Sequence, residues 1–340
     1  MPPPTSDGAP HRTTIAHIAA EAGVSVPTVS KVVNGRPDVA PETRERVEAA
    51  IRRHDYRRRA DTRRSTAVEL VFGDLTSPRT QLLLQGAEES ATAHHLSLTV
   101  STPTHPGWLD ALIGRKPLAV VATTAALPRS DLAKLAARAI PVVMVDPTAE
   151  PPPDTPSVGA TNWTGAVTAT RHLLTSGHER IALIAGPPDD LPTRARLDGY
   201  RAALETAGHP FDPTLVHHTA PTPSAAATAA TALLSLPTRP TAIFACSDLQ
   251  ALGVYEAARR HALHIPDDLS VVGFDDLPLS AWTSPPLTTI RQPLRDMATT
   301  ATTLAISLAE GRTPPHPNQE LPTTLTLRSS TTPPSFRPRC

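Results

Sequence analysis

From residue 68 onward, short runs of apolar and often β-branched residues alternate with amphipathic stretches of helical length. This strand–helix–strand alternation predicts parallel β-sheets that are covered on both faces by helices. The apolar runs are 68–72, 96–100, 118–122, 142–146, 181–185, 242–246 and 271–275. Seven strands in about 260 residues fit two doubly wound lobes better than one. We expect an α/β body over 68–328, with an N-lobe of 68–161 and 290–318 and a C-lobe of 162–289 and 319–328.

The preceding part of the chain, residues 12–56, shows helical periodicity instead. Gly23 permits the positive φ of a tight turn between two short helices. Ser25 can cap the second helix, and Pro27 falls in its first turn, where no backbone donor is lost. A third helix is predicted over 41–53. The side chains expected to form the core of this all-α head are Ile15, Ile18, Ala19, Ala22, Val29, Val32, Val33, Val47, Ala50 and Ile51.

Charge is unevenly distributed along the chain. The whole chain is neutral, but residues 12–64 contain twelve Arg or Lys against seven Asp or Glu, and seven of these Arg lie in 52–64. A basic head on a mildly acidic body suggests an anionic partner for the head alone, although a solvated charged helix end would look the same. The Arg-rich stretch 57–67 is interpreted as a linker, and 1–11 and 329–340 as disordered tails.

Two short helices joined at Gly23, with small polar residues at the start of the second, are typical of a helix-turn-helix. This geometry places the start of the second helix against base edges in the major groove of DNA. Val26 and Pro27 can contact a thymine methyl, Lys31 can reach guanine acceptors, and the hydroxyl groups can donate to phosphates. A plain helical hairpin is the alternative. The residues expected to contact DNA are Thr14, Ser25, Val26, Pro27, Thr28, Ser30, Lys31, Asn34, Tyr56, Arg57, Arg58, Arg59, Arg63 and Arg64.

The segments 22–34 (AGVSVPTVSKVVN) and 41–47 (PETRERV) closely resemble the lactose-repressor family of regulators. Similar landmarks follow in order in the body at 177–186 (GHERIALIAG), 196–200 (RLDGY) and 271–276 (VVGFDD), so the resemblance covers nearly the whole chain. It implies a helix-turn-helix head and a periplasmic-binding-protein-like body. It also implies a homodimeric repressor that binds double-stranded operator DNA under the control of a small-molecule effector, with a sugar as the expected class.

Polar residues follow the apolar strands at the points where open α/β sheets bind ligands. Carboxylates accept pairs of hydroxyl hydrogen bonds and Arg donates a planar fork, so a cleft where Asp and Arg converge suits a polyol. The residues expected to bind the effector are Asp74, Arg79, Asp146, Arg196, Ser247 and Asp275, and the resemblance implies such contacts for the last four. Asp248 is expected to cap the helix 249–261 instead, and Asp276 could equally be structural.

The sequence departs from the family pattern around this site. Arg79 and Thr80 stand where relatives often carry aromatic residues, and the loop around Ala220 also lacks one. Sugar sites usually stack a ring face on an aromatic side chain, so the ligand class stays open. Trp163 and Trp282 could supply that side chain, but each is equally compatible with core packing.

The linker also departs from the family pattern. In relatives it folds into a short helix on DNA and pushes a Leu into the minor groove. Here 57–67 contains no Leu, Ile, Met or Phe and has five Arg, which can pair with phosphates or enter a narrow minor groove but form no apolar wedge. We therefore expect less bending of the operator and a greater reliance on electrostatic contacts.

Other functions find little support in the residues. Gly-x-Ser-x-Gly, His-Glu-x-x-His and phosphate-binding Gly motifs are missing, so an enzyme is not expected. The 14 His are scattered, so neither a metal site nor a cofactor is expected. Cys246 lies in an apolar run and is expected to be a buried, inert thiol. A ligand-blind DNA binder and a solute-capturing transport component are the alternatives.

The location of the protein is also predicted from the sequence. No apolar run is long enough to span a bilayer, which needs about 20 residues. The first ten residues are Pro-rich and lack a hydrophobic signal segment. We therefore expect a cytoplasmic protein with no membrane partner.

Overall fold

The computed structural model describes residues 15–33, 39–54, 66–123, 127–312 and 315–334. The chain divides between residues 64 and 65 into two units, which we call the head and the body. Within the described ranges, no helix is both long and apolar enough to cross a membrane.

The head contains three helices, α1 (Ile15–Ala22), α2 (Val26–Val33) and α3 (Pro41–Arg53). Gly23 has a φ of +65°, and the amide of Val24 donates to the carbonyl oxygen of Ala19 (3.0 Å), which closes the turn after α1. The predicted apolar face of each helix meets the other two in one core. The core contains Ile18, Ala19, Ala22, Val29, Val32, Val47 and Ala50, with Ile15 and Ile51 partly buried against it. The side chain of Val33 lies outside the described part.

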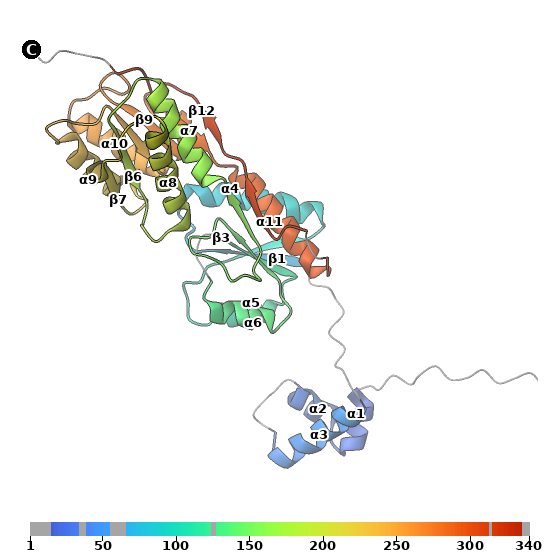
Figure 1. Cartoon of the computed structure of the whole chain (residues 1–340). Helices are drawn as coiled ribbons and strands as arrows, with labels where there is room; N and C mark the ends of the chain where they lie inside the picture. The colour runs from blue at the N-terminus through green and yellow to red at the C-terminus, as the bar shows by residue number, and fades with distance from the viewer. Residues whose placement is uncertain (1–14, 34–38, 55–65, 124–126, 313–314, 335–340) are drawn as a thin grey trace, which may run out of the picture. The chain divides into compact units, whose positions relative to one another are not determined.

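The body contains two six-stranded sheets with helices on both faces (Figure 1). The N-lobe sheet has the strand order β11-β5-β4-β3-β1-β2, and all its pairs are parallel. Its strands are β1 (Ala67–Phe72), β2 (Ser97–Ser101), β3 (Ala119–Thr123), β4 (Val142–Val145), β5 (Ser157–Ala160) and β11 (Asn318–Leu321). Its helices are α4 (Pro78–Ala93), α5 (Trp108–Arg115), α6 (Arg129–Ala136) and α11 (Leu294–Ala309).

Alternate residues of the N-lobe strands face opposite helix layers. Leu70 and Phe72 pack with α4 and α11, whereas Val71 packs with α5 and α6. Figure 1 accordingly shows α5 and α6 side by side below the sheet. Because both faces are covered, the central strands are buried and mainly apolar, and all five residues of β3 are buried.

The C-lobe sheet has the order β12-β10-β9-β8-β6-β7 and is parallel except for the antiparallel pair of β10 and β12. Phe244 and Phe274 face α7 and α8, and Ile243 and Val271 face α9 and α10. The strands are β6 (Ile181–Ala185), β7 (Val216–His218), β8 (Ala242–Ala245), β9 (Ser270–Asp275), β10 (Thr288–Arg291) and β12 (Thr324–Thr326). The helices are α7 (Asn162–Thr175), α8 (Leu191–Thr206), α9 (Pro223–Leu234) and α10 (Asp248–Arg260), with the short 3₁₀ helices η1 (Pro213–Leu215) and η2 (Pro278–Ala281).

All seven predicted strands are present, each within one residue of its expected bounds. Five further strands, β5, β7, β10, β11 and β12, were not predicted. Each has only three or four residues, and β7, β11 and β12 lie at sheet edges, so they show little apolar periodicity.

The chain crosses between the lobes after β5, after β10 and after β11. The second and third crossings come a few residues later than expected, because β10 and β11 extend past residues 290 and 318.

The expected disordered tail from residue 329 is wrong as far as residue 334. Ser330 is fully buried, and its hydroxyl donates to the carbonyl oxygen of Val271 (2.6 Å) and accepts from the amide of Thr288 (2.8 Å). The segment thus packs on the C-lobe, because its hydroxyl groups satisfy backbone groups of the sheet.

Candidate functional site

The start of α2 has the local structure predicted for it. Ser25 immediately precedes the helix, and its hydroxyl accepts from the amide of Thr28 (3.3 Å) and pairs with the Thr28 hydroxyl (2.9 Å). This is an N-cap, which satisfies one of the backbone donors that a helix leaves unpaired. Val29 and Val32 hold the opposite face of the helix in the core of the head.

The predicted base-facing residues of α2 lie at the surface of the head. Val26 is 40% exposed, and Pro27 and Lys31 are also exposed, while Thr28 and Ser30 are half-buried. The other predicted DNA contacts lie outside the described residues; they are Thr14, Asn34, Tyr56, Arg57, Arg58, Arg59, Arg63 and Arg64.

In the body, the residues predicted to bind the effector all line one cavity of about 510 Å³. The N-lobe contributes Asp74, Arg79 and Asp146, and the C-lobe contributes Arg196, Ser247 and Asp275. Asp146 follows β4 and Asp275 ends β9, so both lie at the carboxyl ends of parallel strands, where α/β sheets bind ligands. The volume lies in the range typical of small-molecule sites.

Arg79 and Asp146 form an ion pair on the N-lobe wall. Burial would raise the pKa of Asp146, but the charges of Arg79 and Arg196 outweigh it and lower that pKa, so the group is a carboxylate at neutral pH. The Nε atom of Arg79 is buried and has no hydrogen-bond partner in the part of the chain that the structure describes. Asp74 is held locally, because its Oδ1 accepts from the amide and the hydroxyl of Thr76 (2.7 Å each).

Arg196 is firmly held on the C-lobe wall. Its Nε donates to Asn162 Oδ1 (2.8 Å), its Nη1 to the carbonyl oxygen of Cys246 (2.5 Å), and its Nη2 to Gln292 Oε1 (3.1 Å). The guanidinium also lies 3.7 Å from the ring centroid of Phe274. Cys246 is buried as predicted, and burial raises the pKa of its thiol to about 12.

Two residues of this site, Gln292 and Asn162, were not predicted. Gln292 Nε2 donates to Asp146 Oδ2 (3.0 Å) while its Oε1 accepts from Arg196, so one side chain joins the N-lobe carboxylate to the C-lobe guanidinium. Both residues lie at crossings between the lobes, since Asn162 begins α7 and Gln292 follows β10. The rule that polar residues follow strands would have found Gln292 if β10 had been predicted.

Asp275 is a buried acceptor in the cavity wall. It is only 2% exposed, and its Oδ1 has no hydrogen-bond partner among the described residues. Burial raises its pKa despite the opposing charges of Arg79 and Arg196. Its φ is +109°, a backbone conformation that non-Gly residues rarely adopt. A buried acceptor of this kind is unfavourable until a donor reaches it.

The prediction that Asp248 caps α10 is wrong, because Ser247 is the capping residue. The amide of Gln250 donates to Ser247 Oγ (3.2 Å), and that hydroxyl donates in turn to Gln250 Oε1 (3.1 Å). Ser247 therefore lines the cavity with a hydroxyl that is already engaged in the cap.

Asp248 instead turns into the C-lobe, where it is fully buried. Its carboxylate accepts from the amide of Leu277 (2.7 Å) and from the hydroxyls of Ser280 and Thr289 (2.6 Å each). Its position is therefore structural, as it ties α10 to the turn after β9, to η2 and to β10. Burial, reinforced by the charge of Asp275, raises the pKa of Asp248 to about 7.

Three other candidates lie outside the cavity wall. Asp276 is paired with Arg328, whose Nη2 donates to its Oδ1 (2.6 Å). Trp163 and Trp282 are 49% and 87% exposed, so neither is a core residue. Neither lines the cavity, so neither can stack on a ligand there. No aromatic side chain of the described residues lines the cavity.

Solved structures share this architecture over most of its length. A complex of the transcriptional regulator CelR with cellobiose aligns with a TM-score of 0.72 at 30% identity, over 94% of this chain and 100% of that chain. A lac repressor dimer bound to operator and the anti-inducer ONPF aligns with a TM-score of 0.70 at 27% identity, over 94% and 99% of the two chains.

Sequence comparisons agree with the structural ones. Residues 14–59 match the family model of bacterial regulatory proteins, lacI family, and residues 170–331 match that of the periplasmic binding protein-like domain. The HTH-type transcriptional regulator reg1 of Streptomyces lividans is 34% identical over 338 residues, which cover 94% of this chain and 96% of reg1. The chain therefore belongs to the lacI family of bacterial regulatory proteins, as a DNA-binding transcriptional regulator with a periplasmic-binding-protein-like body.

Proposed function

We propose that this regulator is a repressor whose affinity for operator DNA is controlled by a small polyhydroxyl effector, with a sugar as the first class to test. The effector would bind in the cavity between the lobes. The two structural relatives support this combination, since one is a repressor bound to operator and ONPF and the other is a regulator bound to cellobiose.

The observation that carries this proposal is a pair of unsatisfied polar atoms in the cavity wall. Asp275 Oδ1 is a buried acceptor and Arg79 Nε is a buried donor, and each lacks a partner among the described residues. A hydroxyl group both donates and accepts without adding charge, so a polyol can satisfy both atoms. Since the described wall has no aromatic side chain, recognition would rest on charge-assisted hydrogen bonds and not on ring stacking.

Gln292 provides a link by which such a ligand would affect both lobes. Arg79 pairs with Asp146 through Nη2, and Asp146 is joined through Gln292 to Arg196, so a ligand bound to Arg79 Nε would act on one end of a chain of bonds that reaches both lobes. Effector binding is therefore coupled to a contact between the lobes. A ligand with different affinity for two lobe arrangements shifts the population between them.

On the DNA side, α2 would enter the major groove. A single short head binds weakly, so a homodimer would place two heads on the half-sites of a palindromic operator. The protein would act in the cytoplasm, where its operator is.

The Arg-rich linker, which falls largely outside the described residues, would bind DNA by charge. Replacing Arg63 and Arg64 with Ala should flatten the dependence of log affinity on log salt by about 1 to 2 units per arm. An unchanged slope, or a strongly kinked operator in a complex, would contradict this part of the proposal.

The central experiment is titration of the purified protein onto its operator in the presence of a panel of sugars. Genomic footprinting of bound sites would first supply the operator. We expect at least one sugar to change operator affinity. If none does, the protein is a ligand-blind regulator or responds to another ligand class, and the sugar proposal fails.

The base-reading role of Lys31 can be tested in the same assay. If Lys31 contacts a guanine edge, Lys31→Ala should lose roughly 1–3 kcal/mol on the specific site and relax preference at one base pair. Lys134→Ala, which removes an exposed lysine of the body, is the matched control. Equal losses on specific and random DNA would show that Lys31 contacts only phosphate.

A further inference from the structure

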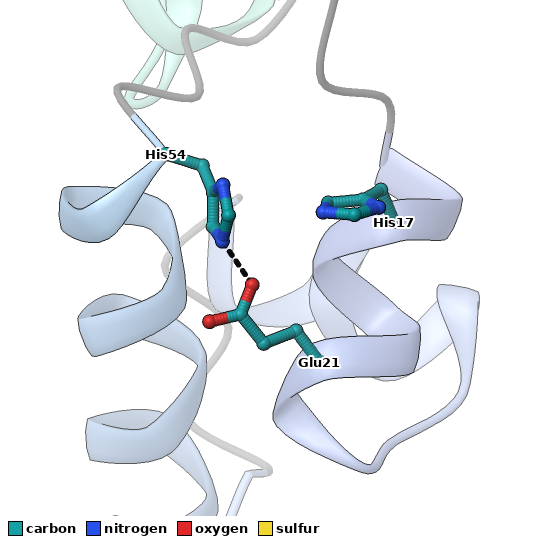
Figure 2. A group of neighbouring side chains, drawn as sticks. All are labelled: His17, Glu21 and His54. Atoms are coloured by element: carbon teal, nitrogen blue, oxygen red, sulfur yellow. Dashed lines mark ion pairs between the residues drawn. The ribbon is translucent and has the colours of Figure 1, made fainter. Parts of the chain in front are cut away.

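The head contains a cluster of three metal-ligating side chains, His17, Glu21 and His54 (Figure 2). His17 and Glu21 lie four residues apart on α1, so they share one face of the helix, and His54 follows the last residue of α3. One donor atom from each residue lies within 4.8 Å of the other two. Figure 2 shows both imidazole rings and the carboxylate in the space between α1 and the end of α3, and the two ring planes are nearly perpendicular (85°) with centroids 5.0 Å apart.

The donor set matches a class of ions. Two imidazoles and one carboxylate are ligands that bind Zn²⁺ and neighbouring divalent transition metals. With metal–ligand bonds of about 2.1 Å, tetrahedral donors lie about 3.4 Å apart, so the most widely separated donor atoms, at most 4.8 Å apart, would approach by up to about 1.4 Å. His17 and Glu21 are exposed and His54 is half-buried, so small side-chain rotations can close this gap. Water can occupy the fourth position.

We infer that His17, Glu21 and His54 bind one divalent transition-metal ion, such as Zn²⁺, which ties α1 to the end of α3. No ligand comes from α2, so a bound ion would leave the predicted DNA-reading surface uncovered. The ion would add a cross-link to a head whose core is small. This site would be independent of the effector cavity, and an ion bound there would contradict the expectation that the chain has no metal site.

The competing explanation is an ion-pair cluster without a metal. Glu21 already pairs with His54 and with Arg53, whose Nη1 lies 2.6 Å from Glu21 Oε1. Arg53 is 69% exposed, so its side chain can leave Glu21 for solvent when an ion binds. Arg53 is then a competitor of the metal for the same carboxylate, and the two explanations predict opposite effects of removing it.

The test is calorimetric titration of the metal-free, full-length protein with Zn²⁺ at neutral pH in a non-chelating buffer. We expect one ion per chain at the tightest site. Removal of a residue that only orients a metal ligand typically weakens metal affinity by about 10- to 100-fold. His17→Ala, His54→Ala and Glu21→Gln each remove a direct ligand, so each should weaken Zn²⁺ affinity by at least this factor. Co²⁺ should give the absorption of a tetrahedral ion in the wild type, and this absorption should disappear in the same variants.

Two further variants separate the explanations. His264→Ala is the matched control, because His264 is an exposed histidine that pairs with a carboxylate, Asp268 (3.3 Å), and it should keep wild-type affinity. Arg53→Ala should bind Zn²⁺ several-fold more tightly, a gain that misfolding cannot produce. The inference is overturned if the wild type binds no Zn²⁺, if His17→Ala keeps wild-type affinity, or if Arg53→Ala binds no more tightly than the wild type.

Discussion

The two walls of the cavity between the lobes use the same kinds of side chain in opposite ways. On the C-lobe wall, Arg196 makes three hydrogen bonds, while Asp275 keeps a buried oxygen without a partner among the described residues. On the N-lobe wall the carboxylate is the anchored group, since Asp146 accepts from Arg79 and Gln292. Arg79 keeps a buried Nε that, in the described part of the chain, has no acceptor. Each lobe therefore contributes one anchored group and one available group.

We therefore expect the anchored groups to contribute mainly to stability and the available groups mainly to ligand binding. The anchored groups, Asp146 and Arg196, are both bonded to Gln292 at a crossing between the lobes, so they hold the lobes together. The available groups, Arg79 Nε and Asp275 Oδ1, are left for a ligand. Substitutions of anchored groups should lower stability most, and substitutions of available groups should lower binding most.

The largest expected effect is the loss of Arg196. Arg196→Gln leaves buried acceptors on Asn162 and Cys246 short of donors, and removal of one member of a buried charged network typically costs about 3–5 kcal/mol. Arg79→Gln removes one of the two partners of the buried Asp146 carboxylate, which keeps its hydrogen bond from Gln292, and should cost less, about 1–3 kcal/mol. Urea unfolding of both variants measures the two losses. Equal losses of unfolding free energy in the two variants would contradict the distinction between an anchored and an available arginine.

The next effect concerns ligand binding by Asp275. Asp275→Asn should weaken binding of the effector by roughly 1.5–3 kcal/mol, because the substitution removes a charge-assisted hydrogen bond. The free energy of unfolding of this variant should not fall, because the substitution removes a carboxylate whose charged form is disfavoured by burial. Asn has nearly the same shape as Asp, so the substitution adds no further strain at the positive φ of this position. Effector titration on operator DNA and urea unfolding measure the two quantities.

Asp276→Asn is the control for this prediction. Asp276 also has a positive φ (+57°) but pairs with Arg328 instead of lining the cavity. It should keep the effector affinity of the wild type. A ligand response in Asp275→Asn that matches the wild type would show that the available oxygen is not part of the effector site.

The smallest expected effect is a pH dependence at Asp248, which lies behind the C-lobe wall. Because burial raises its pKa to about 7, the folded protein keeps a proton near pH 6 that the unfolded chain has released. Stability should therefore fall as pH rises, by about 1 kcal/mol between pH 6 and pH 7 relative to Asp248→Asn. Urea unfolding at several pH values compares the two proteins. Parallel curves would indicate that its three hydrogen-bond donors keep Asp248 ionised throughout.

Strands with a continuous apolar run could be predicted because both of their faces are buried. β6, for example, has the predicted bounds, Ile181–Ala185, and all five of its residues are buried. β12 could not be predicted, since its three residues, Thr324–Thr326, are polar or half-buried and depend on the pairing with β10. Short edge strands are defined by the neighbour to which they bond, and this neighbour is distant in sequence.

The candidate site was predictable where a polar residue follows a long strand, as Asp146 and Asp275 do. The roles of Ser247 and Asp248 could not be assigned in this way, because both residue types cap helices. The choice depends on Leu277, Ser280 and Thr289, which offer Asp248 three donors inside the C-lobe. The proposed metal cluster also escaped prediction, since His54 follows α3 and is distant in sequence from His17 and Glu21 on α1.

The sequence by itself determined the helices of the head, the seven apolar strands of the body, the division into head and body, and most of the polar residues that gather at strand ends. Apolar periodicity, turn residues and caps act over a few neighbouring residues, so they can be recognised without the fold. Only the tertiary structure decided which charged groups are anchored and which remain available. Gln292 lies 146 residues from Asp146 and 96 residues from Arg196, and their hydrogen bonds exist only because two separately formed sheets bring these groups to one crossing of the chain.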